Sequence, residues 1–179
     1  MKNKRILTII GSFGIMLSLG GVYAWSIFVP ELIREYNFTA SQTQLVFGVL
    51  IAIFPLTMIF AGKVEKRLGS AKTALISGLL FLSGYLISGY SGGKFHWVLL
   101  GTGMVAGIGT GFGYLVALVT PVRWFPERKG LITGIAAGGF GLAAVVLSTV
   151  AESLYNSGRT TLEIFRITGL VYGIIIVGL

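Results

Sequence analysis

Long stretches without a charged side chain are the feature that most limits what this 179-residue chain can fold into. Six such stretches follow one another, at residues 6–30, 36–62, 73–93, 95–122, 130–151 and 167–179. A helix needs about 20 apolar residues to cross a bilayer, and all but the last stretch reach that length. With 54% hydrophobic residues and a mean hydropathy of +0.87, the chain is too apolar for a soluble core of this size.

We therefore predict an all-α membrane protein in which residues 1–179 form a single transmembrane domain. The six predicted helices span residues 6–30, 44–62, 73–92, 95–122, 130–151 and 165–179. The second begins near residue 44 because its stretch opens with the polar segment YNFTASQTQ, and the last is cut short at the chain end.

The first stretch also has features of a secretory signal. A charged start precedes an apolar run and a tolerable cleavage site after Ala24. Five further apolar stretches follow, which favours a retained first helix. Cleavage would invert the topology of everything that follows.

The distribution of charge predicts the orientation of the helices. With the N-terminus in the cytoplasm, the outer segments hold four cations and four acids, whereas the inner segments hold ten cations against Glu65 and Glu127. The ten are Lys2, Lys4, Arg5, Lys63, Lys66, Arg67, Lys72, Arg123, Arg128 and Lys129. Because loops rich in Lys and Arg stay inside, we expect a multi-pass protein of the cell membrane, the inner membrane where there are two, with a cytoplasmic N-terminus. The net charge of +8 then reflects topology and not binding to nucleic acid.

Glycines alternate in front of a basic loop at residues 107–130, which read GIGTGFGYLVALVTPVRWFPERKG. Glycines beside cations can hold a phosphate, but this spacing matches neither GxGxxG nor GxxxxGK[ST]. Since these glycines lie inside a predicted span, we interpret them as surfaces for close helix packing. Gly130, Gly134 and Gly138 repeat at steps of four in the fifth span, a pattern that also lets two backbones approach.

Helical periodicity places a few polar and aromatic groups within the spans. At 100° per residue, one face of the first span carries Thr8, Ser12, Tyr23 and Ser26, which suits a wet cavity wall or a packed helix seam. Phe140 in the fifth span lies roughly 200° from the glycine stripe and faces either lipid or a cavity. Periodicity alone favours lipid.

The sequence offers little for enzyme chemistry. It contains no HExxH, no aspartate and no cysteine, and its single histidine, His96, lies at an outer boundary. We therefore predict no catalytic residue, no metal site and no cofactor.

Four motifs carry a resemblance to a known family: YAWSIF at residues 23–28, GFGY at 111–114, RWFPERKG at 123–130 and GIAAGGFGLA at 134–143. Together they resemble the oxalate/formate antiporter family of the major facilitator superfamily, and RWFPERKG is the most specific match. The resemblance covers essentially this whole chain but only the first six of the family's twelve helices. It implies the N-terminal half of a major facilitator fold, an inverted repeat of three plus three helices.

The resemblance implies exchange of small carboxylates, such as oxalate and formate or monocarboxylates, by alternating access. Tyr23 and Tyr114 match tyrosines that face the central cavity, and Phe140 matches a third aromatic position that holds tyrosine in the oxalate exchanger. Loss of that hydroxyl makes oxalate a weaker candidate and suits a bulkier or less polar carboxylate equally well. The family's anion-pairing arginine and lysine lie in the second half, and the charge-free stretches here offer no cation at mid-membrane.

The loop between the second and third spans resembles a cytoplasmic gate of that family, G-x-x-x-D-[RK]-x-G-[RP]. In GKVEKRLGSAK, Gly62 and Gly69 keep the frame and Arg67 keeps a cation. Lys66 stands where the acid normally lies, and Glu65 comes one residue early. The gate is then either rebuilt around Glu65 or weakened, or these side chains are loop charges that hold the topology. The next inner loop adds three gate candidates, Arg123, Arg128 and Lys129.

The expected partners are the lipid bilayer and a small organic anion. A second six-helix half or a homodimer mate would supply the other wall of the cavity, because facilitators place their site between two halves. Two alternatives remain open: a truncated or split carrier fragment without independent transport, and a small structural membrane protein.

Overall fold

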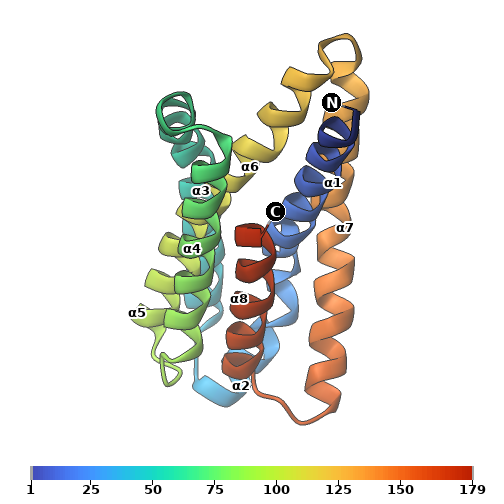
Figure 1. The fold of residues 1–179 in the computed structure, drawn as a ribbon. Coiled ribbons are helices and arrows are strands. Elements are labelled where there is room, and N and C mark those ends of the chain that lie inside the picture. Colours follow the sequence, from blue (N-terminus) through green and yellow to red (C-terminus); the bar gives the residue numbers. More distant parts are fainter. Residues whose placement is uncertain (1, 179) are drawn as a thin grey trace.

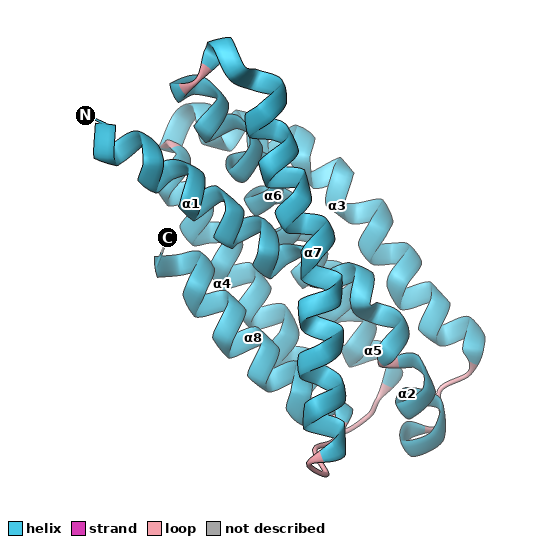
Figure 2. Ribbon diagram, turned by 90° about the vertical axis from the view of Figure 1, so that its right-hand side faces the viewer, coloured by secondary structure: helices cyan, strands magenta, loops and turns pink. Residues whose placement is uncertain are grey.

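The computed structural model describes residues 2–178, with side chains from Ile6 onward. All regular structure in this range is helical (Figure 2). The side chains of Lys2, Lys4 and Arg5, and all of Leu179, lie outside the described residues. The structure therefore places seven of the ten cations predicted for the inner side.

The helices confirm the predicted all-α membrane fold. In chain order they are α1 (Lys2–Leu19), η1 (Gly20–Ile27), α2 (Val29–Tyr36), α3 (Ala40–Leu68), α4 (Ser70–Gly89), α5 (Phe95–Val98), η2 (Leu99–Val105), α6 (Ala106–Trp124), η3 (Pro126–Arg128), α7 (Lys129–Asn156) and α8 (Thr161–Gly178). Six segments within the described range are long and apolar enough to cross a bilayer: Ile6–Ile27, Ala40–Leu68, Ser70–Gly89, Phe95–Trp124, Pro126–Asn156 and Thr161–Gly178.

The two ends of the bundle differ in the segments that they bring together. The N-terminal end of α1, the link between α3 and α4, and the link between α6 and α7 lie at one end, shown at the top of Figure 1. α2 and the link between α7 and α8 lie at the other end. The described cations predicted for the inner side lie in these links or in the helix ends beside them, so they share one end of the molecule.

The second span is longer than the charge-free pattern suggested. The Thr39 hydroxyl accepts the Gln42 amide at 3.2 Å, and the Gln42 side chain accepts the Thr39 amide at 2.9 Å. This reciprocal pair satisfies two backbone donors that a helix start leaves without partners. α3 therefore begins at Ala40, so residues 40–43, which we had placed before the span, form its first turn.

The last span also begins before the predicted boundary. Thr160 and Glu163 exchange backbone-to-side-chain hydrogen bonds of 3.0 and 3.4 Å, which start α8 at Thr161. Arg166 lies inside this helix, where its Nε donates to the Leu162 carbonyl at 3.4 Å and its guanidinium carbon lies 4.9 Å from the centre of the Tyr90 ring. A single charged residue thus does not mark the end of this span.

The first span changes its helix type halfway. α1 continues as η1, eight residues of 3₁₀-helix, which turns by about 120° per residue instead of 100°. The predicted single polar face is therefore wrong. Thr8 and Ser12 line a cavity between α1, α4, α6 and α8, whereas Tyr23 is 52% exposed.

Glycines let α6 lie in backbone contact with α3 on one side and α4 on the other. A Cβ atom at Gly111 would lie 2.6 Å from the Phe54 carbonyl oxygen, and one at Gly109 would lie 2.7 Å from the Phe81 backbone nitrogen. The Ser77 hydroxyl donates to the Gly109 carbonyl at 2.7 Å. The interpretation of these glycines as packing surfaces is confirmed.

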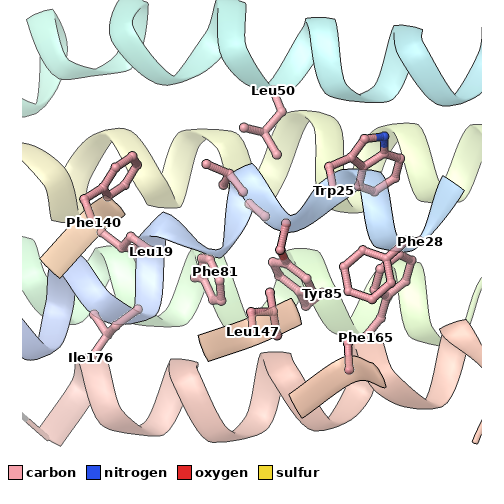
Figure 3. Packing of buried hydrophobic residues seen from close by; sticks show 14 of the residues in the cluster. Leu19, Trp25, Phe28, Leu50, Phe81, Tyr85, Phe140, Leu147, Phe165 and Ile176 are labelled. Carbon is pink, nitrogen blue, oxygen red and sulfur yellow. The ribbon is translucent and has the colours of Figure 1, made fainter. Parts of the chain in front are cut away.

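Aromatic side chains fix the second half of the first span in the bundle (Figure 3). The Trp25 indole donates to the Thr43 carbonyl at 3.1 Å and stacks on Phe165, with ring centres 6.3 Å apart. Phe28 and Tyr85 meet Phe165 edge to face. Met16 and Leu19 are also fully buried. Cleavage after Ala24 would remove Met16 and Leu19 from the core, so the packing supports a retained first helix.

The glycine stripe of α7 has no close neighbour in the described part of the chain. A Cβ atom at Gly130, Gly134 or Gly138 would meet nothing within 4 Å. The adjacent Gly139 does pack tightly, against the Phe13 ring. The step-of-four pattern therefore marks an open face of α7.

Substitution of paired glycines separates close packing from helix propensity. We expect Gly109→Ala to lower the free energy of unfolding by about 1–3 kcal/mol, because its methyl group would overlap the α4 backbone. Gly134→Ala should be neutral or stabilising by up to about 1 kcal/mol, since alanine favours helix and the site is open. Thermal unfolding of both variants in one detergent checks this, and equal shifts would contradict it.

Candidate functional site

Four aromatic rings from four elements meet on one side of the bundle and form what we call the aromatic cluster. It comprises Tyr23 of η1, Phe54 of α3, Tyr114 of α6 and Phe140 of α7. Phe140 lies at its centre, with ring centres 5.3 Å from Tyr23, 5.0 Å from Tyr114 and 6.3 Å from Phe54. Phe54 and Tyr114 are 5.2 Å apart and meet edge to face.

The aromatic cluster is buried at its centre, around Phe140, and exposed at one edge, which carries Tyr23. Phe140 is only 5% exposed, whereas Tyr23 is 52% exposed. Among the described residues, the hydroxyl groups of Tyr23 and Tyr114 have no hydrogen-bond partner. The cluster can therefore offer ring faces and two hydroxyl groups to a bound molecule.

The structure brings together all three residues that the resemblance placed at a cavity. The expectation from periodicity that Phe140 faces lipid is wrong, because its side of α7 packs on η1. A Cβ atom added at Gly20 of η1 would overlap the Phe140 carbonyl, which shows how closely the two backbones approach. Phe54 was missed, since one phenylalanine in an apolar stretch carries no signal that separates a cavity wall from a lipid face.

A bidentate ion pair connects the two loops that were predicted as gates. The Arg123 Nη1 and Nη2 atoms donate to the two carboxylate oxygens of Glu65 at 2.6 and 2.8 Å. The Ser70 hydroxyl donates to the same carboxylate at 2.8 Å, and Glu65 is 3% exposed. Of the predicted alternatives, the geometry favours a loop contact rebuilt around Glu65.

The remaining gate candidates have different environments. Lys66, Arg67, Arg128 and Lys129 are all exposed, and none forms an ion pair in the part of the chain that the structure describes. Gly69 ends α3 at φ +84°, a backbone conformation that L side chains rarely adopt. A Cβ atom at Gly62 would only touch Leu115, at 4.0 Å. Glu65 and Arg123 are thus the candidates that the structure joins.

Among the described residues, the aromatic cluster contains no Lys, Arg, His or Glu side chain. Arg166, which directly precedes the last charge-free stretch, lies within α8 but against Tyr90 at the end of α4. An anion held by the rings would therefore need a cation from beyond the described chain, because a charge without a partner is costly in a membrane.

Comparison with known protein families gives a match along most of the chain. Residues 11–179 match the family described as Major Facilitator Superfamily. The chain is 36% identical to the uncharacterized MFS-type transporter YhjX of Escherichia coli, covering 87% of this chain and 39% of that protein.

Two further relatives are more distant. The chain is 27% identical to human monocarboxylate transporter 14, over 83% of this chain and 29% of that protein. It is 26% identical to the oxalate:formate antiporter of Oxalobacter formigenes, over 91% of this chain and 38% of that protein. The chain thus spans less than half the length of these relatives.

The ion pair between Glu65 and Arg123 predicts that Glu65 and the neighbouring Lys66 contribute differently to the free energy of unfolding. Glu65→Gln should lower the free energy of unfolding by about 1–3 kcal/mol, because it weakens charged hydrogen bonds of a buried group. Lys66→Gln, the exposed control, should change it by less than about 0.5 kcal/mol. A double-mutant cycle with Arg123→Gln, followed by thermal unfolding, should show non-additive losses. Additive losses would mean that the two side chains do not stabilise one another.

Proposed function

The chain belongs to the major facilitator superfamily of membrane transporters, and we propose that it is one half of a secondary transporter that exchanges small carboxylates by alternating access. It is a multi-pass membrane protein and not an enzyme, as its relatives are transporters. The proposal concerns its substrate, its exchange mode and its partner.

The aromatic cluster is the observation that carries the substrate proposal. Its rings offer flat faces to a planar carboxylate, and the Tyr23 and Tyr114 hydroxyl groups can donate to carboxylate oxygens. Two relatives point to the same chemistry, one named as an oxalate:formate antiporter and one as a monocarboxylate transporter. We propose that a small carboxylate binds at the open edge of the aromatic cluster, beside Tyr23.

The open faces of α3 and α7 support a partner of similar size. The spans that contain these two helices are the least buried of the six in the described range. In the most apolar 18-residue part of each span, 22% of residues are buried for α3 and 33% for the α7 span, against 50% for the first and fourth spans. Both helices carry rings of the aromatic cluster, Phe54 on α3 and Phe140 on α7. We propose that a second six-helix half, or a second copy of this chain, covers both faces and supplies the cation that an anion needs.

The clustered charges support an orientation. Lys63 and Lys66 lie in the last turns of α3, Lys72 in the first turn of α4 and Arg128 in η3. The ends of α3 and α4 and the link between α6 and α7 lie at the same end of the bundle (Figure 1). We propose that this end faces the cytoplasm and that the chain lies in the cell membrane. The Glu65 and Arg123 pair would then hold the inner loops together in one state of the transport cycle.

The absence of a cation at the described aromatic cluster also fits a second interpretation, in which this chain does not transport on its own. It would then be a fragment of a split or truncated carrier, or a small structural membrane protein. The adjoining DNA discriminates between these cases. A reading frame with six more spans, carrying an arginine and a lysine inside them, would support a split carrier.

Replacement in a relative tests the transport proposal. In a chimera, this chain would replace the matching 38% of the Oxalobacter formigenes antiporter. We expect carboxylate counterflow in proteoliposomes, with the apparent KM raised about tenfold by Tyr23→Ala or Tyr114→Ala, equivalent to about 1.4 kcal/mol of lost contact. Tyr90→Ala, outside the cluster, is the matched control.

Unchanged affinity in both cluster variants would show that the aromatic cluster is not the binding site. Robust exchange by the 179-residue chain alone would show that two copies can share a cavity and that no separate second half is needed.

A hydroxyl at position 140 should change the substrate preference of the same chimera. Phe140→Tyr adds a donor at the centre of the aromatic cluster and should raise the ratio of oxalate to monocarboxylate exchange by about threefold to tenfold. Phe140→Leu, which removes the ring without adding a donor, should weaken exchange of both substrates. Competition between labelled oxalate and propionate measures the ratio, and an unchanged ratio in Phe140→Tyr would exclude a specificity role for this position.

A further inference from the structure

A groove of about 450 Å³ lies between α6 and α7, at the end of the bundle that carries the basic loops. Its lining consists of Leu118, Val119, Val122, Arg123, Pro126, Lys129 and Thr133. Most of the wall is apolar, with the charged and hydroxyl-bearing side chains at or near one end.

The groove is continuous with the helix faces that carry the aromatic cluster. At 100° per residue, Tyr114, Leu118 and Val122 lie within about 80° of one another on α6. On α7, Lys129, Thr133 and Phe140 lie within about 40°. Since Tyr114 and Phe140 touch, with ring centres 5.0 Å apart, the two faces converge at the aromatic cluster.

The charge in the groove is a single available ammonium group. The Arg123 guanidinium is bound to both oxygens of Glu65 and is thereby neutralised. Lys129 has no ion-pair or hydrogen-bond partner among the described residues, and Glu127, the acid of the same loop, does not line the groove. An anion that enters the groove would therefore meet one cation and an apolar wall.

We infer that this groove is a second, vestibular binding site for a monovalent carboxylate with a small apolar body, in which Lys129 holds the carboxylate. The inference rests on the proposed function and adds a site on the route to the aromatic cluster. Eleven residues of helix separate Lys129 from Phe140, a rise of about 16 Å, so the two sites are distinct.

The composition of the groove selects against a second charge on the ligand. With its first carboxylate at Lys129, a dianion would bring its second carboxylate into a mostly apolar lining, where the described residues offer no second cation that is free of an acid partner. An apolar tail in the same place gains from leaving water. Propionate is therefore the expected type of ligand, and oxalate binds here more weakly.

Direct binding to the purified 179-residue chain tests the vestibular site. In nanodiscs of phosphatidylcholine, saturation-transfer NMR would compare propionate and oxalate on the wild type and variants. We expect Lys129→Gln to weaken propionate binding about threefold to tenfold, within the range for a partly solvated charged hydrogen bond, and Lys129→Arg to retain it. Lys72→Gln, an exposed inner cation away from the groove, is the control, and thermal unfolding shows that each variant is folded.

The outcomes separate this inference from the proposed function. If Lys129→Gln leaves propionate binding to the chain unchanged while Tyr114→Ala weakens carboxylate exchange by the chimera, the vestibular site is overturned and the aromatic cluster stands. If the folded wild type binds neither anion, and the chimera also fails to exchange carboxylates, both are overturned. Tighter binding of oxalate that depends on Lys129 would overturn the preference for a monovalent ligand. If phosphatidylglycerol in the nanodisc weakens propionate binding, and Lys129→Gln does not change the propionate binding that is left, the groove is a lipid site and the inference is overturned.

Discussion

The close backbone contact of α6 with α3 and α4 is the constraint on which the rest of the molecule depends. Lipid chains are as apolar as the helices, so helices associate through tight packing and hydrogen bonds. Gly109 and Gly111 permit that packing on opposite sides of α6. Because α6 is held this closely, its middle carries Tyr114 to the rings of Phe54 and Phe140, and its end carries Arg123 to Glu65.

The number and order of spans follow from the sequence because charge is so costly in hydrocarbon. The ends of the spans were harder to predict, since a charge-free stretch measures where charge is absent and not where hydrogen bonding begins. Thr39 starts α3 and Thr160 starts α8 through local caps that lie among polar residues. Arg166 is tolerated inside α8 because its guanidinium lies over a ring near the helix end, where it need not enter the apolar centre.

The site was only partly predictable, because each of its residues depends on a neighbour that is distant in the sequence. The family resemblance placed Tyr23, Tyr114 and Phe140 at one cavity, and the structure puts their rings in contact. The helical wheel misplaced Phe140, since a wheel describes one helix and not which side another helix covers. Prediction of the ion pair between Glu65 and Arg123 was limited in the same way. The two residues are 58 positions apart, and the sequence showed both charges but not their contact.

The change of helix type at Gly20 has a consequence for the thickness of bilayer that suits this protein. The 3₁₀-helix rises about 2.0 Å per residue against 1.5 Å in an α-helix, so the eight residues of η1 lengthen the first span by about 4 Å. Residues 6–27 then reach about 37 Å, beyond the roughly 30 Å of a typical hydrocarbon core. Tilting of the helix or a locally thicker bilayer must absorb this surplus, so membrane thickness bears directly on the segment that carries Tyr23.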